Sequence, residues 1–109
     1  ARSQSYELSG PIAEASLTGL NLDIAFIGVD GIDSTAGCTT HEEVEAHTNS
    51  VMIAHSRHVA VVADSSKLGK VAFARICEAG AIDELISDSA ADDAAVKGLT
   101  DAGVHVTLV

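Results

Sequence analysis

Two short polar segments contain the residues that could bind a small anion. Asp30-Gly31-Ile32-Asp33 follows the apolar run of residues 24–29, and Asp64-Ser65-Ser66-Lys67 follows the apolar run of residues 59–63. A lysine supplies a point charge for a phosphate or carboxylate, and the two aspartates could act as an acid and a base. Together the segments could hold an anionic ligand or assist a proton transfer.

Both segments also have ordinary structural explanations. Glycines and aspartates after a strand usually turn the chain and bind its amides, and a lysine there is usually solvated. The cluster of Arg57, Lys67 and Lys70 indicates either solvated helix ends or a local anion pocket in an otherwise acidic chain. A binding site stands level with these explanations because both segments follow strands that are apolar throughout, and ligands bind outside the carboxyl ends of parallel strands.

Other motifs for chemistry are incomplete. The glycine spacing matches neither G-x-G-x-x-G nor G-x-x-x-x-G-K-[ST], so no nucleotide fingerprint is met. His41 and Glu45 are spaced to share a metal ion, but no third ligand follows at a convincing distance along the chain. We therefore expect no metal site, no cofactor and no catalytic residue.

The hydrophobic pattern predicts the elements that must position these loops. Predicted strands are residues 24–29 and 59–63, both buried on two faces, residues 85–86, the half-exposed edge strand 104–108, and a weak candidate at 6–8. Predicted helices are residues 11–20, 40–56, 71–78 and 89–102, with residues 30–39 as a loop. This alternation predicts one α/β domain with a mostly parallel sheet flanked by helices.

Two predicted helix starts bear on the site. Thr40 with Glu43 forms a capping box for the second helix, and Ser89 is expected to cap the last one. The backbone amides at the helix start near Thr40 would attract an anion. The sequence thus predicts a helix N-terminus beside the Asp30 loop.

Composition excludes several classes of protein. The formal net charge is −10, from 16 acidic and 6 basic side chains, so this segment is not expected to bind DNA itself. No apolar run approaches the roughly 18 residues of a membrane span, and the first residues lack a signal-peptide core. Cys38 and Cys77 follow no metal or redox spacing, which indicates free thiols in a reducing cytoplasm.

These residues, in this order, resemble the C-terminal sensor domain of the DeoR family of bacterial transcription regulators. The most specific matches are the Gly-x-x-Gly-Ile-Asp turn of residues 28–33 and the Asp-Ser-Ser-Lys-x-Gly loop of residues 64–69. Gly37-Cys38-Thr39-Thr40, Glu45-Ala46 and residues 82–88 also match, and the likeness covers nearly the whole chain.

The resemblance implies a fold like that of ribose-5-phosphate isomerase and the CoA transferases, incomplete at its N-terminus. It implies a cytoplasmic regulator, usually a repressor, that binds a phosphorylated sugar or related metabolite and forms a homo-oligomer with no membrane partner. Operator DNA would be bound only by an N-terminal winged helix-turn-helix outside residues 1–109. This chain would then be one partial sensor domain.

The resemblance also implies which residues contact the effector: Gly28, Asp30, Gly31, Asp33, Gly37, Thr39, Thr40, Glu45 and Lys67. One departure concerns the segment after Glu45-Ala46, where the family usually has Val-Lys-Arg and this chain has Thr48-Asn49-Ser50. Two expected cations are missing. Either the effector is less anionic, or other residues contact its phosphate, or this member senses weakly.

Two alternative functions rank below a sensor. A sugar-phosphate isomerase would use Asp30 or Asp33 as its base and Lys67 as an electrostatic stabiliser, but the loop lacks a convincing second acid–base partner. A pure oligomerisation module would leave both loops without a ligand.

Overall fold

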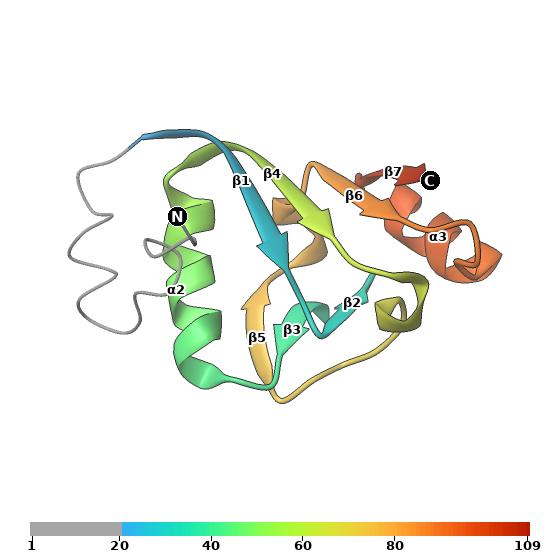
Figure 1. Cartoon of the computed structure of the whole chain (residues 1–109), viewed down its shortest axis with the longest axis horizontal. Helices are drawn as coiled ribbons and strands as arrows, with labels where there is room; N and C mark the ends of the chain where they lie inside the picture. The colour runs from blue at the N-terminus through green and yellow to red at the C-terminus, as the bar shows by residue number, and fades with distance from the viewer. Residues whose placement is uncertain (1–20) are drawn as a thin grey trace.

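The main sheet consists of four parallel strands (Figure 1). The computed structural model describes residues 21–109, so the predicted helix 11–20 and the strand candidate 6–8 lie outside the described residues. The sheet order is β1-β4-β6-β7, and each neighbouring pair is parallel. The strands are β1 (Leu22–Gly28), β4 (Ser56–Val62), β6 (Glu84–Ser87) and β7 (His105–Leu108). The predicted parallel sheet and its edge strand β7 are therefore confirmed.

Two α-helices connect these strands. Helix α2 (Glu43–Ala54) joins β1 and its following hairpin to β4, and α3 (Asp93–Asp101) joins β6 to β7. Figure 1 shows α2 beside β1 and α3 beside β7. None of the helices described over residues 21–109 has the length and apolar character needed to cross a bilayer.

Both predicted helix caps are wrong. Thr40 lies in a strand, and α2 begins after Glu42, whose side chain makes no capping hydrogen bond. Helix α3 begins after Asp92, whose carboxylate accepts a hydrogen bond from the amide of Ala95, so Ser89 lies before the helix. An aspartate at the N-cap satisfies an amide that has no partner inside the helix, which fixes where α3 starts.

A second, antiparallel sheet of three short strands was missed by the sequence pattern. It has the order β2-β3-β5, with β2 (Gly31–Asp33), β3 (Gly37–Thr40) and β5 (Ala74–Cys77). The prediction of a loop over residues 30–39 and of a helix over residues 71–78 is therefore wrong. In β5 buried Ala74 and Ile76 alternate with exposed Arg75, which is the period of a strand.

The hydrophobic core joins the two sheets and both α-helices. Its fully buried side chains come from different elements and include Ile32, Val61, Leu85, Leu99 and Val104. Small residues fill the remaining space, as expected for a chain with 3% aromatic residues. The core thereby holds the hairpin β2–β3 against the carboxyl ends of the parallel strands.

Strand β1 is not buried on both faces, which corrects the prediction for residues 24–29. Ile24 and Phe26 are 41% and 61% exposed, while Ala25 and Ile27 are buried. Within residues 21–109 only β4 pairs with β1, so β1 lies at an edge of the described sheet. An apolar residue run cannot distinguish a covered face from an uncovered one.

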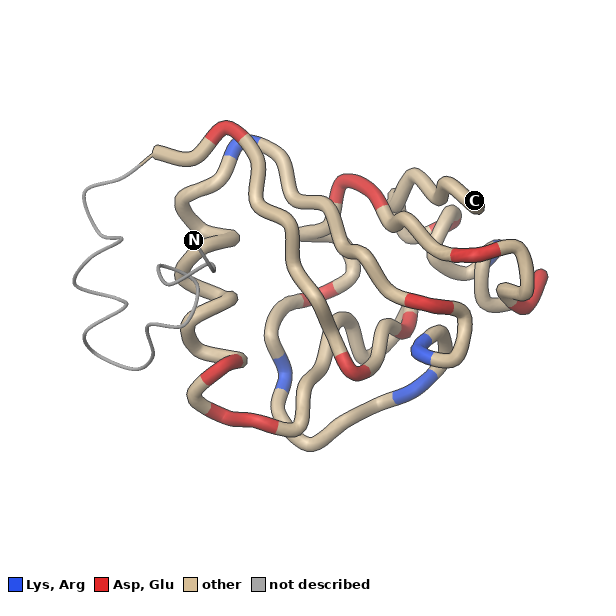
Figure 2. The backbone as a smooth tube through the Cα atoms, viewed as in Figure 1, with Lys and Arg blue, Asp and Glu red and all other residues tan. Residues whose placement is uncertain are grey.

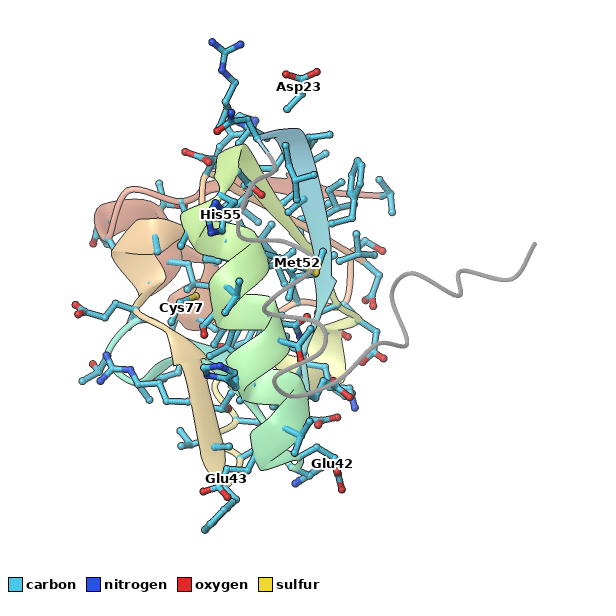
Figure 3. All side chains as sticks on the ribbon, turned by 90° about the vertical axis from the view of Figure 1, so that its left-hand side faces the viewer. Asp23, Glu42, Glu43, Met52, His55 and Cys77 are labelled. Atoms are coloured by element: carbon cyan, nitrogen blue, oxygen red, sulfur yellow. The ribbon has the colours of Figure 1, made fainter. Side chains whose placement is uncertain are left out.

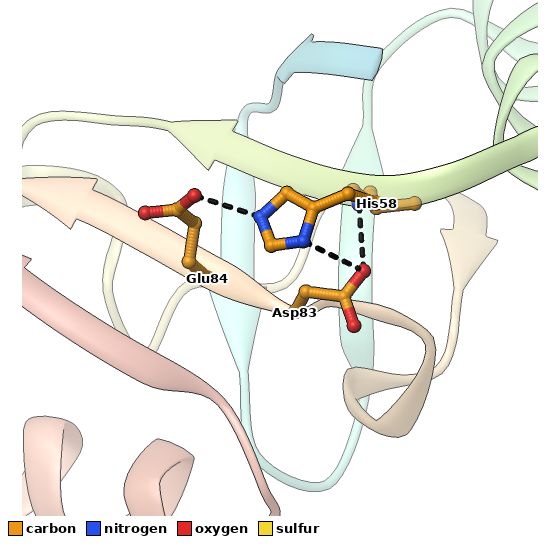
Figure 4. Close-up of polar contacts among 4 residues, drawn as sticks. His58, Asp83 and Glu84 are labelled. Carbon is orange, nitrogen blue, oxygen red and sulfur yellow. Dashed lines mark hydrogen bonds and ion pairs between the residues drawn. The ribbon is translucent and has the colours of Figure 1, made fainter. Parts of the chain in front are cut away.

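A polar cluster fixes the start of β6 against β4 (Figure 4). His58 Nε2 lies 2.8 Å from Glu84 Oε1, and His58 Nδ1 lies 3.8 Å from Asp83 Oδ2. The same Asp83 oxygen accepts a hydrogen bond of 2.7 Å from the amide of Val59. These contacts reinforce the register between β4 and β6. The segments that follow these two strands meet near Lys67.

Candidate functional site

Asp30 lies two residues after the end of β1 and is held in place by the hairpin. Its Oδ2 accepts hydrogen bonds of 2.9 Å from the Thr40 hydroxyl and 2.9 Å from the His41 amide. Its own amide donates to the carbonyl of Thr39 at 2.9 Å. The pKa of Asp30 is lowered mainly by the hydrogen bond from the His41 amide. The hydrogen bond from the Thr40 hydroxyl and, more weakly, the charge of Lys67 lower it further. Asp30 is therefore a fixed carboxylate at neutral pH.

Lys67 belongs to the short 3₁₀ helix η2 (Ser65–Lys67), which two carboxylates hold in place. Asp64 Oδ1 accepts from the amide of Ser66 at 2.9 Å, and Asp88 Oδ2 accepts from the amide of Ser65 at 2.8 Å. Hydrogen bonds to Ser66 and to Ser65, respectively, lower the pKa of Asp64 and Asp88. Because Asp88 follows β6, the Lys67 loop is tied to a neighbouring strand end.

Backbone contacts join the Lys67 loop to the hairpin. The amide of Gly69 donates to the carbonyl of Ile32 at 2.8 Å, and Ile32 also forms a parallel bridge with Leu68. Further along, the amide of Ala72 donates to Thr39 Oγ1 at 2.8 Å. The predicted meeting of the two loops is thus observed, since the strands that precede them are adjacent and parallel.

Gly31 allows the closest approach between the two loops. A Cβ atom built on Gly31 would lie 2.3 Å from the carbonyl oxygen of Lys70 and 2.8 Å from Thr39 Oγ1. Such distances are shorter than carbon–oxygen contacts in packed proteins, so no larger residue fits without moving the backbone of Lys70. Glycine is required here by space.

A cavity of about 320 Å³ opens where the loops meet. It is lined by Asp30, His41, Ser66, Lys67, Lys70, Val71 and Ala72. Figure 2 shows that Lys and Arg segments are few, whereas acidic segments are spread over the described chain. No hydrogen bond within residues 21–109 uses Asp30 Oδ1, so this oxygen can accept a hydrogen bond from a ligand. The cavity is therefore lined by two lysines, a residue type that binds anions, and by one carboxylate that can accept hydrogen bonds from hydroxyl groups.

A larger cavity of about 680 Å³ lies between β1 and α2, and Asp30 lines both cavities. Its other lining residues are Leu22, Ile24, Ala25, Phe26, Gly28, Val29, Glu45, Asn49 and Met52. Asn49 belongs to the segment that departs from the family pattern. No residue lining this larger cavity is basic, and Asp30 and Glu45 are acidic, so the cavity disfavours a phosphate.

The structure brings together some of the predicted site residues. Asp30 and Lys67 line the smaller cavity, and Gly28 and Glu45 line the larger one. Gly31, Thr39 and Thr40 are buried behind Asp30, where they support it and the segment of residues 70–72.

Like Gly31, Thr39 and Thr40, two further predicted site residues, Asp33 and Gly37, line neither cavity. Asp33 Oδ2 accepts hydrogen bonds from the amides of Thr35 at 3.0 Å and Ala36 at 2.8 Å, so Asp33 closes the β2–β3 turn. Gly37 has a φ of 80°, and a Cβ there would lie 2.1 Å from the carbonyl oxygen of Cys77. Both residues shape the hairpin. Their contact with an effector stays a prediction that this geometry does not support.

The predicted anion site at a helix N-terminus is not formed. Helix α2 starts at Glu43, and the amide of His41 already donates to Asp30. The first turn of α2 carries Glu43 and Glu45, whose charges repel an anion. Figure 3 shows Glu42 and Glu43 at this end of the helix. The positive charge of the site comes from lysine side chains.

Several lining residues were missed at the sequence level. His41 was considered only as a metal ligand, and Ser66 lies in the Asp-Ser-Ser-Lys-x-Gly loop but was not named as a site residue. Val71 and Ala72 carried no motif of their own, whereas the clustering of Lys67 with Lys70 was a usable signal. Arg57, the third member of that basic cluster, instead lies 3.9 Å from Asp23 in an exposed pair at the other end of β1. The residues around 70–72 were misassigned because they precede a strand that was predicted as a helix.

The chain is similar to known transcriptional regulators over almost its whole length. A relative from Escherichia coli O157:H7 that carries the name of an aga operon transcriptional repressor is 39% identical over 108 residues, covering 99% of this chain and 40% of the relative. The HTH-type transcriptional regulator GlpR of Haloferax volcanii is 34% identical, covering 96% of this chain and 41% of its own length. The glycerol-3-phosphate regulon repressor of Escherichia coli K12 is 30% identical, covering 91% of this chain and 40% of its own length.

The similarity extends to a defined part of these regulators. The chain spans about 40% of the length of the curated relatives it matches. These relatives are transcriptional regulators and not enzymes, which argues against the isomerase alternative. A family model described as the DeoR C terminal sensor domain matches residues 1–89. The chain therefore belongs to the DeoR family of transcriptional regulators, as their C-terminal sensor domain.

Proposed function

We propose that this sensor domain binds a phosphorylated sugar or a closely related phosphorylated metabolite in the smaller cavity. The observation that carries the proposal is that Asp30, Lys67 and Lys70 line the same space of about 320 Å³, and that hydrogen bonds hold Asp30 in place. The ammonium groups would contact the phosphate, and Asp30 Oδ1 would accept a hydrogen bond from a hydroxyl group.

The relatives support this class of effector. One of them is named for the glycerol-3-phosphate regulon, whose namesake combines a phosphate with hydroxyl groups. The four parallel strands with an added antiparallel sheet are also compatible with a fold like that of ribose-5-phosphate isomerase and the CoA transferases. Lys67 and Lys70 would contact the phosphate in the smaller cavity, whereas Asn49 of the departing segment lines the larger one.

The effector would act on DNA through another part of the regulator. The names of several relatives include the term HTH, which supports a helix-turn-helix reader domain in the rest of the protein. A net charge of −10 makes residues 1–109 themselves a poor ligand for DNA. The regulator would work in the cytoplasm. The effector would change its affinity for operator DNA only if the effector binds one of two states of the regulator more tightly than the other.

A thermal-shift screen on the intact regulator tests the proposed effector class. Glycerol 3-phosphate and a panel of pentose and hexose phosphates are compared with the unphosphorylated compounds and inorganic phosphate. A ligand at a concentration of 100 times its Kd stabilises the folded state by about 2.7 kcal/mol, which gives a clear rise in Tm. We expect at least one phosphorylated compound to raise Tm and its unphosphorylated form to have little effect.

Replacing Lys67 with alanine is expected to reduce that rise in Tm. The variant loses one of the two ammonium groups of the cavity, and a charged hydrogen bond contributes about 1.5–3 kcal/mol. Lys97→Ala is the matched control, because Lys97 is exposed on α3 and pairs with Asp101. A folded regulator that no phosphorylated compound stabilises would contradict the proposal, and equal responses of the two variants would remove Lys67 from the site.

The regulator is also proposed to form a homo-oligomer. Three large apolar side chains are exposed on two adjacent strands: Ile24 and Phe26 on β1, and Val62 at the end of β4. An apolar surface of this kind favours contact with a second subunit.

Phe26→Ser is therefore expected to lower the oligomeric mass of the intact regulator, because it removes an exposed aromatic ring from that surface. Sedimentation velocity measures the change. Phe73→Ser is the control, since Phe73 is also exposed but precedes β5. An unchanged mass for Phe26→Ser, or the same loss in both variants, would argue against this surface.

A further inference from the structure

The antiparallel sheet places the two cysteines of the chain opposite each other. Cys38 in β3 and Cys77 at the end of β5 are Cα partners in the β3–β5 register. Side chains that are directly opposite in antiparallel strands have Cβ atoms about 4.5–5.5 Å apart, and a disulfide spans Cα atoms about 4.4–6.8 Å apart. Both thiols are free in this structure. The β3–β5 register shifts between Cys38 and Thr39, so the cysteine pair lies beside an irregularity of the ladder, and the disulfide would link β3 to β5 at that point.

The two thiols differ in their accessibility. Cys38 is fully buried, whereas Cys77 is half-buried at the strand end, where Figure 3 shows it between β5 and α2. An oxidant from solvent therefore meets Cys77 first, and Cys38 lies behind it.

The two thiols also differ in acidity. A hydrogen bond from the Cys38 thiol lowers the pKa of Cys77, and the positive charge of Arg75 adds to this effect. The same interaction, together with burial, raises the pKa of Cys38. The thiolate is the reactive form of cysteine, so Cys77 has the character of an attacking thiol and Cys38 that of a resolving thiol.

We propose that Cys38 and Cys77 form a reversible redox site, which a hydroperoxide converts into an intramolecular disulfide. The Cys77 thiolate attacks a peroxide oxygen, so that an S–O bond forms, the O–O bond breaks and water leaves after protonation in the case of hydrogen peroxide. The Cys38 sulfur then attacks the Cys77 sulfur, the S–S bond forms, the S–O bond breaks and a second water leaves. The two thiols supply the two electrons, and a low-molecular-weight dithiol reverses the reaction.

The disulfide would form next to the supports of the proposed effector cavity. Cys38 directly precedes Thr39, whose Oγ1 accepts the hydrogen bond from the amide of Ala72 in the cavity wall. The same strand, β3, also carries Thr40, whose hydroxyl donates a hydrogen bond to Asp30. A disulfide at Cys38 would therefore be attached to the strand that supports this cavity. The redox proposal itself does not depend on the identity of the effector.

Peptide mapping of the intact regulator tests the redox site. The reduced protein is treated with one equivalent of hydrogen peroxide, alkylated and digested with trypsin without reductant. Arg57, Lys67, Lys70 and Arg75 lie between the two cysteines, so cleavage leaves them on separate peptides unless a disulfide joins them. We expect a linked pair of peptides containing Cys38 and Cys77, which disappears after treatment with dithiothreitol.

Single variants distinguish the two roles. In Cys38→Ala, Cys77 should accumulate as a sulfenic acid that dimedone traps, because the resolving thiol is missing. In Cys77→Ser, we expect Cys38 to react with peroxide at least about tenfold more slowly than Cys77 does in the wild type. Folded wild-type protein that yields no linked peptides, or Cys38 that reacts as fast in Cys77→Ser, would overturn the proposal. The thermal-shift screen is run on reduced protein, so its outcome is independent of this one.

Discussion

Gly31→Ala is expected to abolish effector binding by the intact regulator. The new Cβ would lie 2.3 Å from the Lys70 carbonyl oxygen and 2.8 Å from Thr39 Oγ1. Because the first contact is with backbone, the segment of residues 70–72 must move away from the hairpin, and this segment forms one wall of the smaller cavity. Overpacking of this kind costs about 1–3 kcal/mol of stability. The effector Kd is measured by calorimetry at a temperature where circular dichroism shows a folded protein.

Gly80→Ala is the matched control for this substitution. A Cβ on Gly80 would meet no atom within 4 Å, so the variant should keep the wild-type Kd and a similar Tm. A Gly31→Ala protein that binds the effector with the wild-type Kd would show that the close approach between the hairpin and Lys70 does not shape the binding site.

Asp30→Asn is expected to weaken effector binding by about 10- to 100-fold, since hydrogen bonds to charged groups contribute about 1.5–3 kcal/mol. The substitution keeps the size of the side chain but removes the charge that Thr40 and His41 hold in place. Asp33→Asn is the control, because its side-chain oxygen can still accept the amide bonds of the β2–β3 turn outside both cavities. Equal losses of affinity in the two variants would contradict the role given to Asp30.

The lowered pKa of Asp30 should make the free energy of unfolding depend on pH in the acidic range. Its pKa in the folded state is lowered from the ordinary value of 3.8, mainly by the His41 amide and the Thr40 hydroxyl. The resulting contribution to the free energy of unfolding is present above about pH 3.8 and is lost as the pH falls through the lowered pKa. Denaturant titrations should therefore show a difference between wild type and Asp30→Asn that shrinks in this acidic range. A difference that is constant down to complete acid unfolding would contradict the assignment.

Much of the parallel sheet was predictable from hydrophobic runs and their turn residues. The runs at residues 24–29 and 59–63 became β1 and β4, and α2 lies within the helix predicted for residues 40–56. The exposure of Phe26 was not predictable, because an apolar residue looks the same whether or not a neighbour covers it. The local pattern thus identified the strands but not what lies on each face.

The antiparallel sheet was missed for a different reason. β2 has three residues and β3 and β5 have four each, so their periodicity is too short to outweigh the glycines and aspartates around them. β2 and β3 pair as a local hairpin, but β5 joins them only by pairing across a long sequence separation, as between Cys38 and Cys77. The alternation of buried Ala74 and Ile76 with exposed Arg75 was a usable signal, but it was assigned to a helix.

The candidate site was predictable at the level of loops and not of individual contacts. The rule that ligands bind at the carboxyl ends of parallel strands correctly brought Asp30 and Lys67 together. The rule could not separate Asp30 from Asp33, because both are aspartates in the same turn-rich segment. Only the hairpin, which directs Asp33 into its own turn, distinguishes them.

The central claim is that the smaller cavity recognises the phosphate group of the effector through its lysines. Calorimetric titration of the intact regulator with the best compound from the screen, and with its unphosphorylated form, gives the ratio of the two Kd values. The account predicts a large preference for the phosphorylated compound in the wild type and in Lys97→Ala, and a preference reduced by at least about tenfold in Lys67→Ala. An undiminished preference for the phosphorylated compound in Lys67→Ala would contradict it.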